Sequence, residues 1–390
     1  MQVRLNPAAS GIPPYPMSQL AALADGLRSE GRNVYDFGIG DPREPTPDFI
    51  RRALVEAVPD VSQYPTVLGQ PGLRKAAAAW VRRRLGVSLD PATQVLPSTG
   101  SKEAIFHVAP LVVDPASDRR VVLYGEPGYP VYERGAAMAG AEALALSLNE
   151  GNGFMLDPSS IAADDAARVC MAWINYPHNP TGAVATLDDL RRLLEWCRAR
   201  DVVVCSDECY VDTYYGDDAP PSILQAAGDD LAGVLAFFSC SKRSGMTGYR
   251  TGFVAGDAGL VGPYAKLRAH IGSATSDFVQ HAAIAAWSDD RHAEQRRVVF
   301  ASKRAVFDEL FDDLGIEVAG SRATFYLWVR APAGMSGDSF AKHLLEAGIL
   351  VTPGASFGPS GEGYVRMALV PTVEQCRLAA SAWRALERSG

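Results

Sequence analysis

The sequence predicts an α/β protein with a mainly parallel sheet, helices on both faces of that sheet, and a second, smaller α+β domain. Short apolar runs alternate with helical stretches through the middle of the chain, as expected when helices connect parallel strands. The chain has 390 residues, of which 47% are hydrophobic and 21% charged, an ordinary globular composition. At this length one core usually stops growing, so we expect two domains.

The first elements can be placed from their apolar spacing and caps. Helices are expected over 17–30 and over 47–58, with Thr46 as the N-cap of the second. The clearest helix of the middle unit is 187–200, which Thr186 can cap. The strands expected in this unit are 121–124, 169–174, 202–205, 234–238 and 252–255.

The last part of the chain mixes helices with strands. One long helical region is expected near 283–314. It is followed by strands at 324–329 and 364–369 and by helices at 339–347 and 373–386. We therefore expect an N-terminal segment, 1–45, that joins the small domain, a large domain over 46–285, and a small C-terminal domain over 286–390.

Charge and composition argue against several classes of function. The formal net charge of -8 makes a nucleic-acid partner improbable, because phosphate backbones require a basic face. No run of about 18 apolar residues predicts a membrane span, and the first 16 residues lack the regions of a signal peptide, so a cytoplasmic location is expected. The six cysteines form no CxxC pair and the histidines no HExxH pattern, so no metal site is expected.

The strongest chemical signal is the polar stretch that follows the run 234–238. A lysine attacks an aldehyde only when its amine is neutral, and nearby cations lower its pKa toward that state. Lys242 is the candidate. Ser239, Ser241 and Arg250 add two hydroxyls and a planar guanidinium, a set suited to a phosphate monoester. The alternative is a solvated basic turn.

A second signal directly follows the run 202–205. A carboxylate at a strand end can hold a pyridine nitrogen protonated, and a protonated ring accepts electrons from a carbanion better than a neutral one. We assign this role to Asp207, with a helix cap as the alternative. The Tyr210 hydroxyl can bond a phenolic oxygen of the same ring. Glu208 alternates to the other side of the strand and is expected to be structural.

The third and fourth signals are two further turns. Residues 175–182 contain two X-Pro bonds and a glycine, which form a stiff turn that can aim the Asn179 amide at the ring. Gly100, Ser101 and Lys102 precede or begin a helix, where backbone N–H groups can cradle the same phosphate. Tyr129 follows another strand and can stack on the ring, although core packing would explain it equally well.

Taken together, these stretches resemble the enzymes of fold type I that depend on pyridoxal 5′-phosphate (PLP), and among them the class I and II aminotransferases of the aspartate aminotransferase superfamily. The resemblance covers nearly the whole chain. It implies a seven-stranded sheet, an aminotransferase activity, and a covalent link between Lys242 and PLP. Ser239, Ser241 and Arg250 match the family's phosphate ligands, while Asn179, Asp207 and Tyr210 match the residues around its ring. Lys242, Asp207 and Tyr210 are the expected catalytic residues.

The resemblance also implies how substrate and a second subunit are bound. Arg366 lies in a strand that resembles the one whose arginine grips the substrate α-carboxylate, a bidentate role. The loop that contains Gly40 is similar to a loop that meets the same carboxylate, and Asn179 is expected to contribute there too. Tyr64 matches a tyrosine that reaches the neighbouring subunit's phosphate. A homodimer with shared active sites is therefore expected, with amino acids and 2-oxo acids as substrates.

A finer resemblance is to the succinyldiaminopimelate aminotransferases of the bacterial lysine pathway, in the stretches 12–16, 239–257, 272–274 and 285–288. Lys102, Arg243 and Arg268 are candidate cations for the distal carboxylates of such a substrate. Aspartate, alanine or an aromatic amino acid are alternative substrates. A PLP-dependent lyase or oxidase is the alternative activity, because the cofactor residues do not fix the bond that is cleaved. A dehydrogenase is disfavoured by the lack of a GxGxxG stretch after an early strand.

Overall fold

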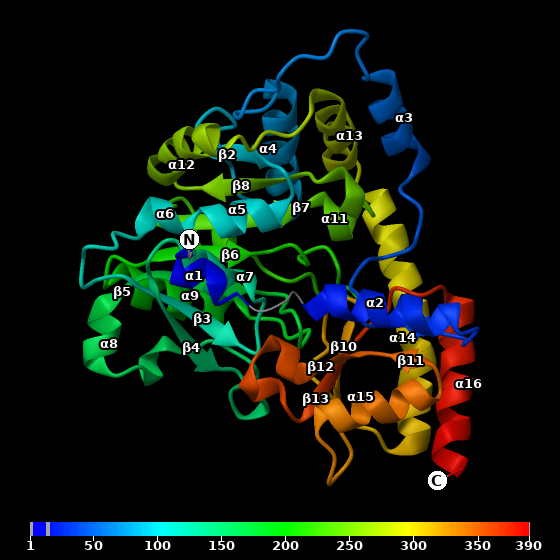
Figure 1. Cartoon of the computed structure of the whole chain (residues 1–390). Coiled ribbons are helices and arrows are strands. Elements are labelled where there is room, and N and C mark those ends of the chain that lie inside the picture. The colour runs from blue at the N-terminus through cyan, green and yellow to red at the C-terminus, as the bar shows by residue number, and fades with distance from the viewer. Residues whose placement is uncertain (1–2, 13–15, 390) are drawn as a thin grey trace.

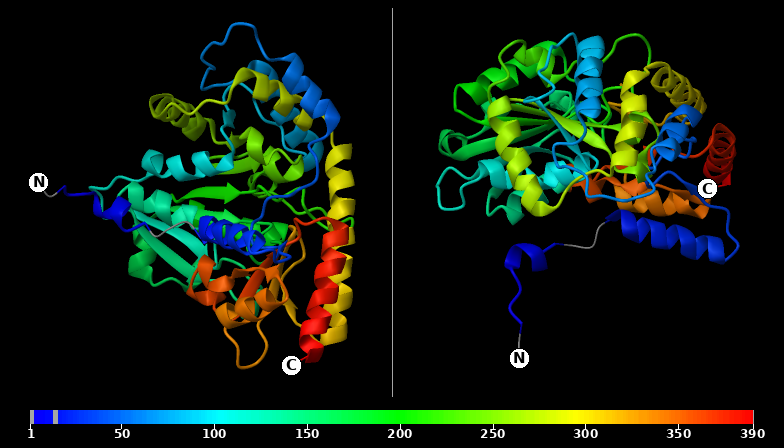
Figure 2. Two further views of the ribbon diagram at one scale, coloured as in Figure 1. Left: turned by 45° about the vertical axis from the view of Figure 1, so that its right-hand side comes forward. Right: turned by 90° about the horizontal axis from the view of Figure 1, so that it is seen from above.

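The structure is a computed structural model that describes residues 3–12 and 16–389. Of the stretch 12–16, residues 13–15 lie outside the described residues. Helix α1 (Pro7–Ser10) contacts α7 (Val131–Met138) on the side of the large sheet, whereas α2 (Pro16–Ser29) lies with the C-terminal part of the chain (Figure 2).

A seven-stranded sheet forms the centre of the large domain (Figure 1). Its strands in spatial order are β2 (Val95–Ser98), β8 (Gly252–Gly256), β7 (Val234–Ser239), β6 (Val203–Asp207), β5 (Val169–Asn175), β3 (Val121–Glu126) and β4 (Glu142–Ser147). The five from β7 to β4 pair in parallel. This confirms the predicted fold class and the predicted strand positions, and it adds β2 and β4.

The last strand predicted for the large sheet, 252–255, runs antiparallel to its neighbours. β8 pairs antiparallel with both β7 and β2. Between β7 and β8 the chain forms only the short helix α11 (Cys240–Arg243) and the single turn η3 (Thr247–Tyr249). A parallel strand would need a crossover that runs the length of the sheet, usually a helix, and neither of these short elements is long enough to supply it, so the chain returns in the opposite direction.

Helices cover both faces of the sheet. One face carries α4 (Pro71–Leu85), α9 (Leu187–Arg198), α10 (Ile223–Ala227) and α13 (Asp277–Ser288). The other carries α5 (Ser101–His107), α6 (Ala109–Val112), α7 and α12 (Ala258–Ile271). Two further helices of this part are α3 (Asp48–Glu56) and α8 (Ala163–Arg168).

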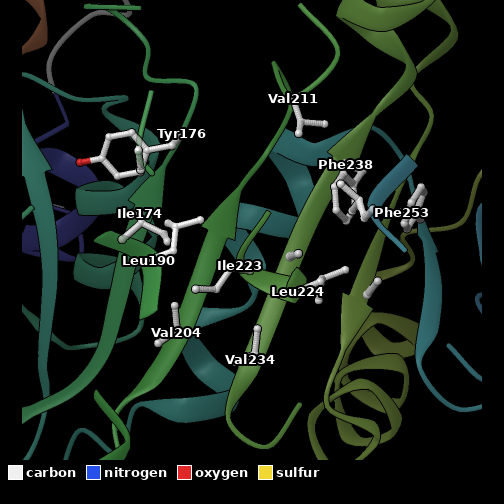
Figure 3. Packing of buried hydrophobic residues seen from close by; sticks show 14 of the residues in the cluster. Ile174, Tyr176, Leu190, Val204, Val211, Ile223, Leu224, Val234, Phe238 and Phe253 are labelled. Carbon is white, nitrogen blue, oxygen red and sulfur yellow. The ribbon is translucent and has the colours of Figure 1, made fainter. Parts of the chain in front are cut away.

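Alternation along the strands explains why both faces are apolar. In β7, Val234, Ala236 and Phe238 point to the core under α9 and α10, whereas Leu235 and Phe237 point to the core under α5 and α12. Figure 3 shows the first of these cores, with Phe238 beside Phe253 of β8. A strand that is buried on both sides must be apolar throughout, which is why periodicity of two is absent from these runs.

The small domain has its own sheet and core. Its four strands, in the order β12 (Thr352–Pro353), β13 (Tyr364–Ala368), β10 (Tyr326–Arg330) and β9 (Val318–Ala319), are antiparallel. β1 (Tyr35–Asp36) pairs in parallel with β11 (Ile349–Leu350), which ties the N-terminal segment to this part of the chain. Helices α14 (Arg291–Leu314), α15 (Gly337–Glu346) and α16 (Val373–Ser389) complete the domain, and α14 and α16 lie side by side (Figures 1 and 2).

One local prediction needs correction, one is made more specific and one is confirmed. Thr46 does not cap α3; its hydroxyl donates instead to the carbonyl of Gly245 at 2.6 Å, and the N-cap is Pro47. The helical region expected near 283–314 consists of two helices, because α13 and α14 are separated at 289–290. The predicted cap of α9 is confirmed, since Thr186 forms a reciprocal capping box with Asp189.

Candidate active site

A cavity of about 310 Å³ lies at the carboxyl ends of β5, β6 and β7 and is closed on one side by β10 and β13 of the small domain. This is the edge at which open parallel sheets bind ligands. Arg243 and Arg268 are considered separately below. Of the other residues assigned to the site from the sequence, all but two line this cavity. The exceptions are Gly100, which lies directly behind the wall, and Tyr64, which lies elsewhere.

Lys242 projects into this cavity from α11. Ser239 is the N-cap of the helix and accepts a hydrogen bond from the backbone N–H of Ser241 at 3.1 Å, which fixes the turn after β7. The Lys242 amine donates to the carbonyl of Gly40. Burial lowers the pKa of Lys242 to about 8, and the positive charges of Arg366 and Arg250 contribute, while Asp41 opposes them. About a tenth of the amine is therefore neutral at pH 7, far more than for an ordinary lysine.

Asp207 is buried at the end of β6 and is held at both oxygens. Oδ2 accepts from the Tyr132 hydroxyl at 2.9 Å, and Oδ1 accepts from the backbone N–H of Cys209 at 3.2 Å. The Asn175 side chain donates to the Asp207 carbonyl at 2.7 Å. Burial raises the pKa of Asp207, whereas the bonds from Cys209 and Tyr132 lower it. A rigid carboxylate is thus available to share a proton with a ring nitrogen.

The turn before α5 and the turn after α11 meet at the wall of the cavity. Gly100 has φ 75°, and a Cβ there would lie 2.3 Å from Nη2 of Arg250, so only glycine lets the guanidinium lie against the turn. Arg250 itself has φ 52°, an unfavourable backbone region for a residue with a side chain. Ser101 and Ser241 line the cavity beside this guanidinium.

This part of the wall fits the phosphate group that the resemblance implies. A guanidinium, hydroxyls and a turn without a Cβ form a cradle for a compact anion. Asp207 and Lys242 line the same cavity and offer a carboxylate for a ring nitrogen and an amine for an aldehyde. The residues present therefore fit PLP.

The small domain contributes Tyr326 and Arg366. The hydroxyls of Tyr210 and Tyr326 are 2.8 Å apart. Arg366 donates from Nη1 to Oδ1 of Asn179 at 3.0 Å and from Nη2 to the Gly38 carbonyl at 2.8 Å. Its guanidinium lies 4.3 Å from the ring centroid of Tyr326 and 4.6 Å from that of Phe357. Two aromatic rings and two acceptors thus orient a cation whose position on the cavity wall suits a carboxylate ligand.

The other residues assigned from the sequence differ in where they lie. Tyr129 lines the cavity and meets Tyr132 edge to face, with ring centroids 5.8 Å apart. Gly40 lines it through the loop that bonds Lys242. Tyr64 is 100% exposed in the arch between α3 and α4 at the top of Figure 1, away from the cavity.

Arg243 and Arg268 are not positioned to bind a substrate, which corrects the sequence prediction. Arg243 is buried behind α11, where it bonds Asp212 at 2.7 Å and Asp290 at 2.6 Å. Arg268 is fully buried and pairs with Glu103. Each cation lies near a chemically important stretch in sequence, but a helix turns its side chain into the protein. Of the three candidates only Lys102 lines the cavity.

A second, larger cavity of about 980 Å³ adjoins the first and shares Lys102, Tyr129, Arg250 and Phe357 with it. Its further ionisable side chains are both acidic and basic, namely Glu103, Glu126, Glu133, Arg134 and His107. Glu103 is engaged by Arg268, whereas Glu126 accepts one hydrogen bond from the Ser360 backbone at 2.9 Å. The two cavities together can hold a ligand longer than a simple amino acid.

Sequence reasoning missed several residues of the site. Tyr132 stood in the same stretch as Tyr129, but it lies in the first turn of α7 whereas Tyr129 precedes that helix, so spacing alone did not relate the two. Tyr326 and Phe357 left no signal either, because their place in the cavity depends on how the small domain packs on the large one. Cys209 sits between two assigned residues, and its thiol donates to the Ser101 hydroxyl at 2.9 Å.

Comparisons with known proteins agree on one family. The sequence profile of the family described as aminotransferase class I and II matches residues 32–382. The LL-diaminopimelate aminotransferase of Desulforudis audaxviator is 40% identical over 366 residues, covering 93% of this chain and 92% of that protein. That of Aquifex aeolicus is 39% identical and covers 93% of this chain and 94% of that protein.

Solved structures are equally similar in fold. A crystal structure of an aminotransferase from Neisseria meningitidis has a TM-score of 0.91 at 33% identity and covers 98% of this chain and 100% of that one. A "probable N-succinyldiaminopimelate aminotransferase" from Thermus thermophilus has a TM-score of 0.87 at 28% identity, covering 95% and 99%. Within residues 3–12 and 16–389, no helix has the length and apolarity needed to cross a membrane.

Proposed function

This chain belongs to the class I and II aminotransferase family, and we propose that its amino donor is LL-diaminopimelate and its acceptor 2-oxoglutarate, in lysine biosynthesis. The observation that carries the substrate proposal is the second cavity, which adds acidic and basic side chains beyond Lys102. LL-Diaminopimelate ends in both an ammonium and a carboxylate. The relatives at 39% and 40% identity support the free diamino acid over its N-succinyl form.

As members of this family do, the enzyme uses PLP, which when bound supplies a ring that withdraws electrons from the substrate Cα. We assign the ring nitrogen to Asp207, the phenolic oxygen to Tyr210 and Asn179, and stacking to Tyr129. The phosphate is assigned to Arg250, Ser239 and Ser241 and to the turn at Gly100, Ser101 and Lys102, which contributes its backbone N–H groups. These assignments rest on the cradle beside Gly100 and on the carboxylate held by Tyr132.

Two residues would then carry the reaction. Arg366 binds the α-carboxylate, helped by the loop at Gly40, and so sets the orientation of Cα. Lys242 would take the substrate Cα proton at Nζ and hold it for transfer to the cofactor, a role for which its pKa of about 8 is suited. Two half-reactions imply ping-pong kinetics.

The distal end of the substrate would extend into the second cavity. We assign its carboxylate to Lys102 and its ammonium to Glu126, which both line that cavity. An N-succinyl group would replace the ammonium by a neutral amide and place a further carboxylate near Glu126 and Glu133, which costs binding energy through like-charge repulsion. The carboxylates therefore favour a free distal amine.

The test is a donor panel with the purified enzyme and 2-oxoglutarate, in which glutamate formation is followed for LL-diaminopimelate, its N-succinyl form, aspartate, alanine and an aromatic amino acid. We expect the highest kcat/KM for LL-diaminopimelate. A higher value for the N-succinyl form would overturn the substrate assignment and leave the family activity intact. Release of ammonia or uptake of oxygen would indicate a lyase or an oxidase.

A comparison of two amino donors, LL-diaminopimelate and glutamate, tests the assignment of Lys102 to the distal carboxylate. Lys102→Met should lower kcat/KM for LL-diaminopimelate at least about tenfold, because a charge-assisted hydrogen bond is lost. It should leave the half-reaction with glutamate within about twofold of the wild type, since glutamate does not reach so far and the variant keeps the backbone N–H of residue 102. Equal losses for both donors would place Lys102 at the cofactor alone.

We also propose two domains and a homodimer. The boundary expected at 285 falls inside α13, which packs on α3 and α4, so the break at 289–290 is the better division. In the dimer, Tyr64 on its exposed arch would reach the partner's phosphate. Mixing inactive Lys242→Ala chains with weakened Tyr64→Ala chains should then restore activity, because one site of each mixed dimer is complete. Sedimentation of the wild type as a monomer would contradict this.

A further inference from the structure

Arg268 of α12 lies behind the turn that precedes α5, on the side away from the cavity. Its side chain is 0% exposed, and that of its partner Glu103 is 17% exposed. Nη1 donates to the carbonyl of Pro97 at 2.6 Å, while Nη2 donates to the Glu103 carboxylate. One guanidinium therefore holds a residue before the turn and a residue after it.

Glu103 in turn contacts the backbone of the turn. Its Oε1 accepts the backbone N–H of Thr99 at 2.8 Å, so Arg268, Glu103 and Thr99 form one chain of contacts. About one helical turn before Arg268, the Tyr264 hydroxyl donates to the carbonyl of Ala104 at 2.6 Å. α12 thus fixes the backbone on both sides of Gly100.

The same contacts carry an electrostatic consequence. The Glu103 carboxylate accepts the N–H of Thr99, directly before Gly100, so its negative charge stands close to the place assigned to a dianionic phosphate. Such a charge would repel the anion, and a buried partner of opposite sign offsets it far better than a screened surface cation. Arg268 is that partner.

We propose that Arg268 is a positioning residue for the cofactor phosphate. It holds the turn at 97–101 in the shape that accepts Arg250 against Gly100, and it neutralises Glu103 beside the bound dianion. This inference rests on the proposed placement of the phosphate at that turn. It assigns a role at the cofactor to a residue that the sequence suggested for the substrate.

The test compares two ligands that differ only in the phosphate. Pyridoxamine 5′-phosphate and pyridoxamine lack the aldehyde, so neither joins Lys242, and the ratio of their dissociation constants reports the phosphate contact. Calorimetric titration of the full-length apoprotein gives this ratio for the wild type, Arg268→Met, Glu103→Gln and the double variant. Lys266→Met removes a positive charge from an exposed position of the same helix and serves as the matched control.

We expect Arg268→Met to reduce the preference for the phosphate form at least about tenfold while pyridoxamine binding stays within about twofold, because an uncompensated carboxylate is left beside the anion. The double variant should recover most of the preference, since the glutamine side chain that replaces Glu103 is neutral and still offers an oxygen to the Thr99 N–H. Lys266→Met should keep the wild-type ratio. Equal weakening of both ligands by Arg268→Met, or no recovery in the double variant, overturns the proposal.

A second pair decides the question if Arg268→Met does not fold. Glu103→Gln keeps an acceptor for the Thr99 N–H and removes the negative charge, so the preference should be kept or increased. Glu103→Ala removes the acceptor and should reduce it. Equal reductions by both variants would overturn the proposal, whereas a wild type that shows no preference for the phosphate form would instead refute the proposed cofactor placement.

Discussion

The hydroxyl of Tyr132 donates a hydrogen bond to Oδ2 of Asp207 at 2.9 Å, and the Tyr132 ring lies nearly flat on Trp173, with centroids 4.9 Å apart and planes 18° apart. Stacking fixes the ring, and the fixed ring fixes the hydroxyl. Because burial raises the pKa of Asp207 and this bond lowers it, Tyr132 helps to keep the carboxylate ionised.

Tyr132→Phe should therefore raise the pKa of Asp207 and shift the acid limb of the kcat profile to higher pH. A hydrogen bond to a charged group contributes about 1.5 to 3 kcal/mol, so we expect kcat at neutral pH to fall about tenfold or more. The dependence of kcat on pH between roughly 5 and 9 measures both effects. Tyr176→Phe, which removes another buried hydroxyl from a bond to the Phe154 carbonyl, is the control and should leave the acid limb in place.

The pKa of Lys242 near 8 predicts how fast apoprotein captures PLP. The neutral fraction of the amine rises from about a tenth at pH 7 to about nine tenths at pH 9, so the capture rate should rise about tenfold over this range. Stopped-flow absorbance follows the reaction. Arg366→Met removes a positive charge that lowers this pKa and should slow capture at pH 7, whereas Arg366→Lys should do so less. A rate that does not depend on pH would contradict the assignment of Lys242 as the nucleophile.

The sequence could predict those site residues whose position depends on local structure, and not those whose position depends on how distant parts of the chain pack together. Lys242, Asp207 and Asn179 each follow a buried strand, and the common edge of a parallel sheet brings strand ends together, so local patterns sufficed. Tyr326 reaches the site only because β10 of another domain closes it. Local patterns also could not predict where the side chains of Arg243 and Arg268 point. A charged residue near a motif can form a buried ion pair as readily as it can face a substrate.

The same contrast holds for the fold. Apolar runs located five strands of the large sheet, and the capping residues located α9. The reversed direction of β8 depends on the lack of a crossover helix between it and β7, which the apolar spacing of the two strands does not report. Thr46 shows why a helix cap cannot always be predicted from the sequence. Its hydroxyl binds the carbonyl of Gly245, which is distant in sequence, and does not cap the helix.

Gly100→Ala should weaken cofactor binding without a comparable loss of stability. A methyl group at this position would lie 2.3 Å from Arg250, whose flexible side chain can move aside but then leaves the phosphate site. We expect the dissociation constant of pyridoxamine 5′-phosphate to rise about tenfold or more, the loss of one charge-assisted contact. Gly86→Ala is the control, since Gly86 has a similar φ of 71° with open space around it. Equal losses in the two variants would point to backbone strain alone.

Glu208 predicts a pH dependence of stability that is separate from catalysis. It is buried on the other side of β6 from Asp207, bonds Ser206 at 2.9 Å and the Ile223 N–H at 2.8 Å, and burial raises its pKa from 4.5 to about 7. Because the folded chain binds this proton more tightly than the unfolded chain, its contribution is complete below about pH 4.5 and is lost as the pH rises through 7.

Glu208→Gln keeps an oxygen acceptor for both bonds and removes the charge that forms above pH 7. Relative to the wild type, the variant should therefore gain stability between pH 5 and pH 8, by on the order of 2 to 3 kcal/mol, and its melting temperature should rise by about 4 °C or more at pH 8. Calorimetric scans at the two pH values measure the difference. Glu195→Gln on the exposed face of α9 is the matched control and should show no such gain. An equal difference between variant and wild type at both pH values would mean that Glu208 does not titrate in this range.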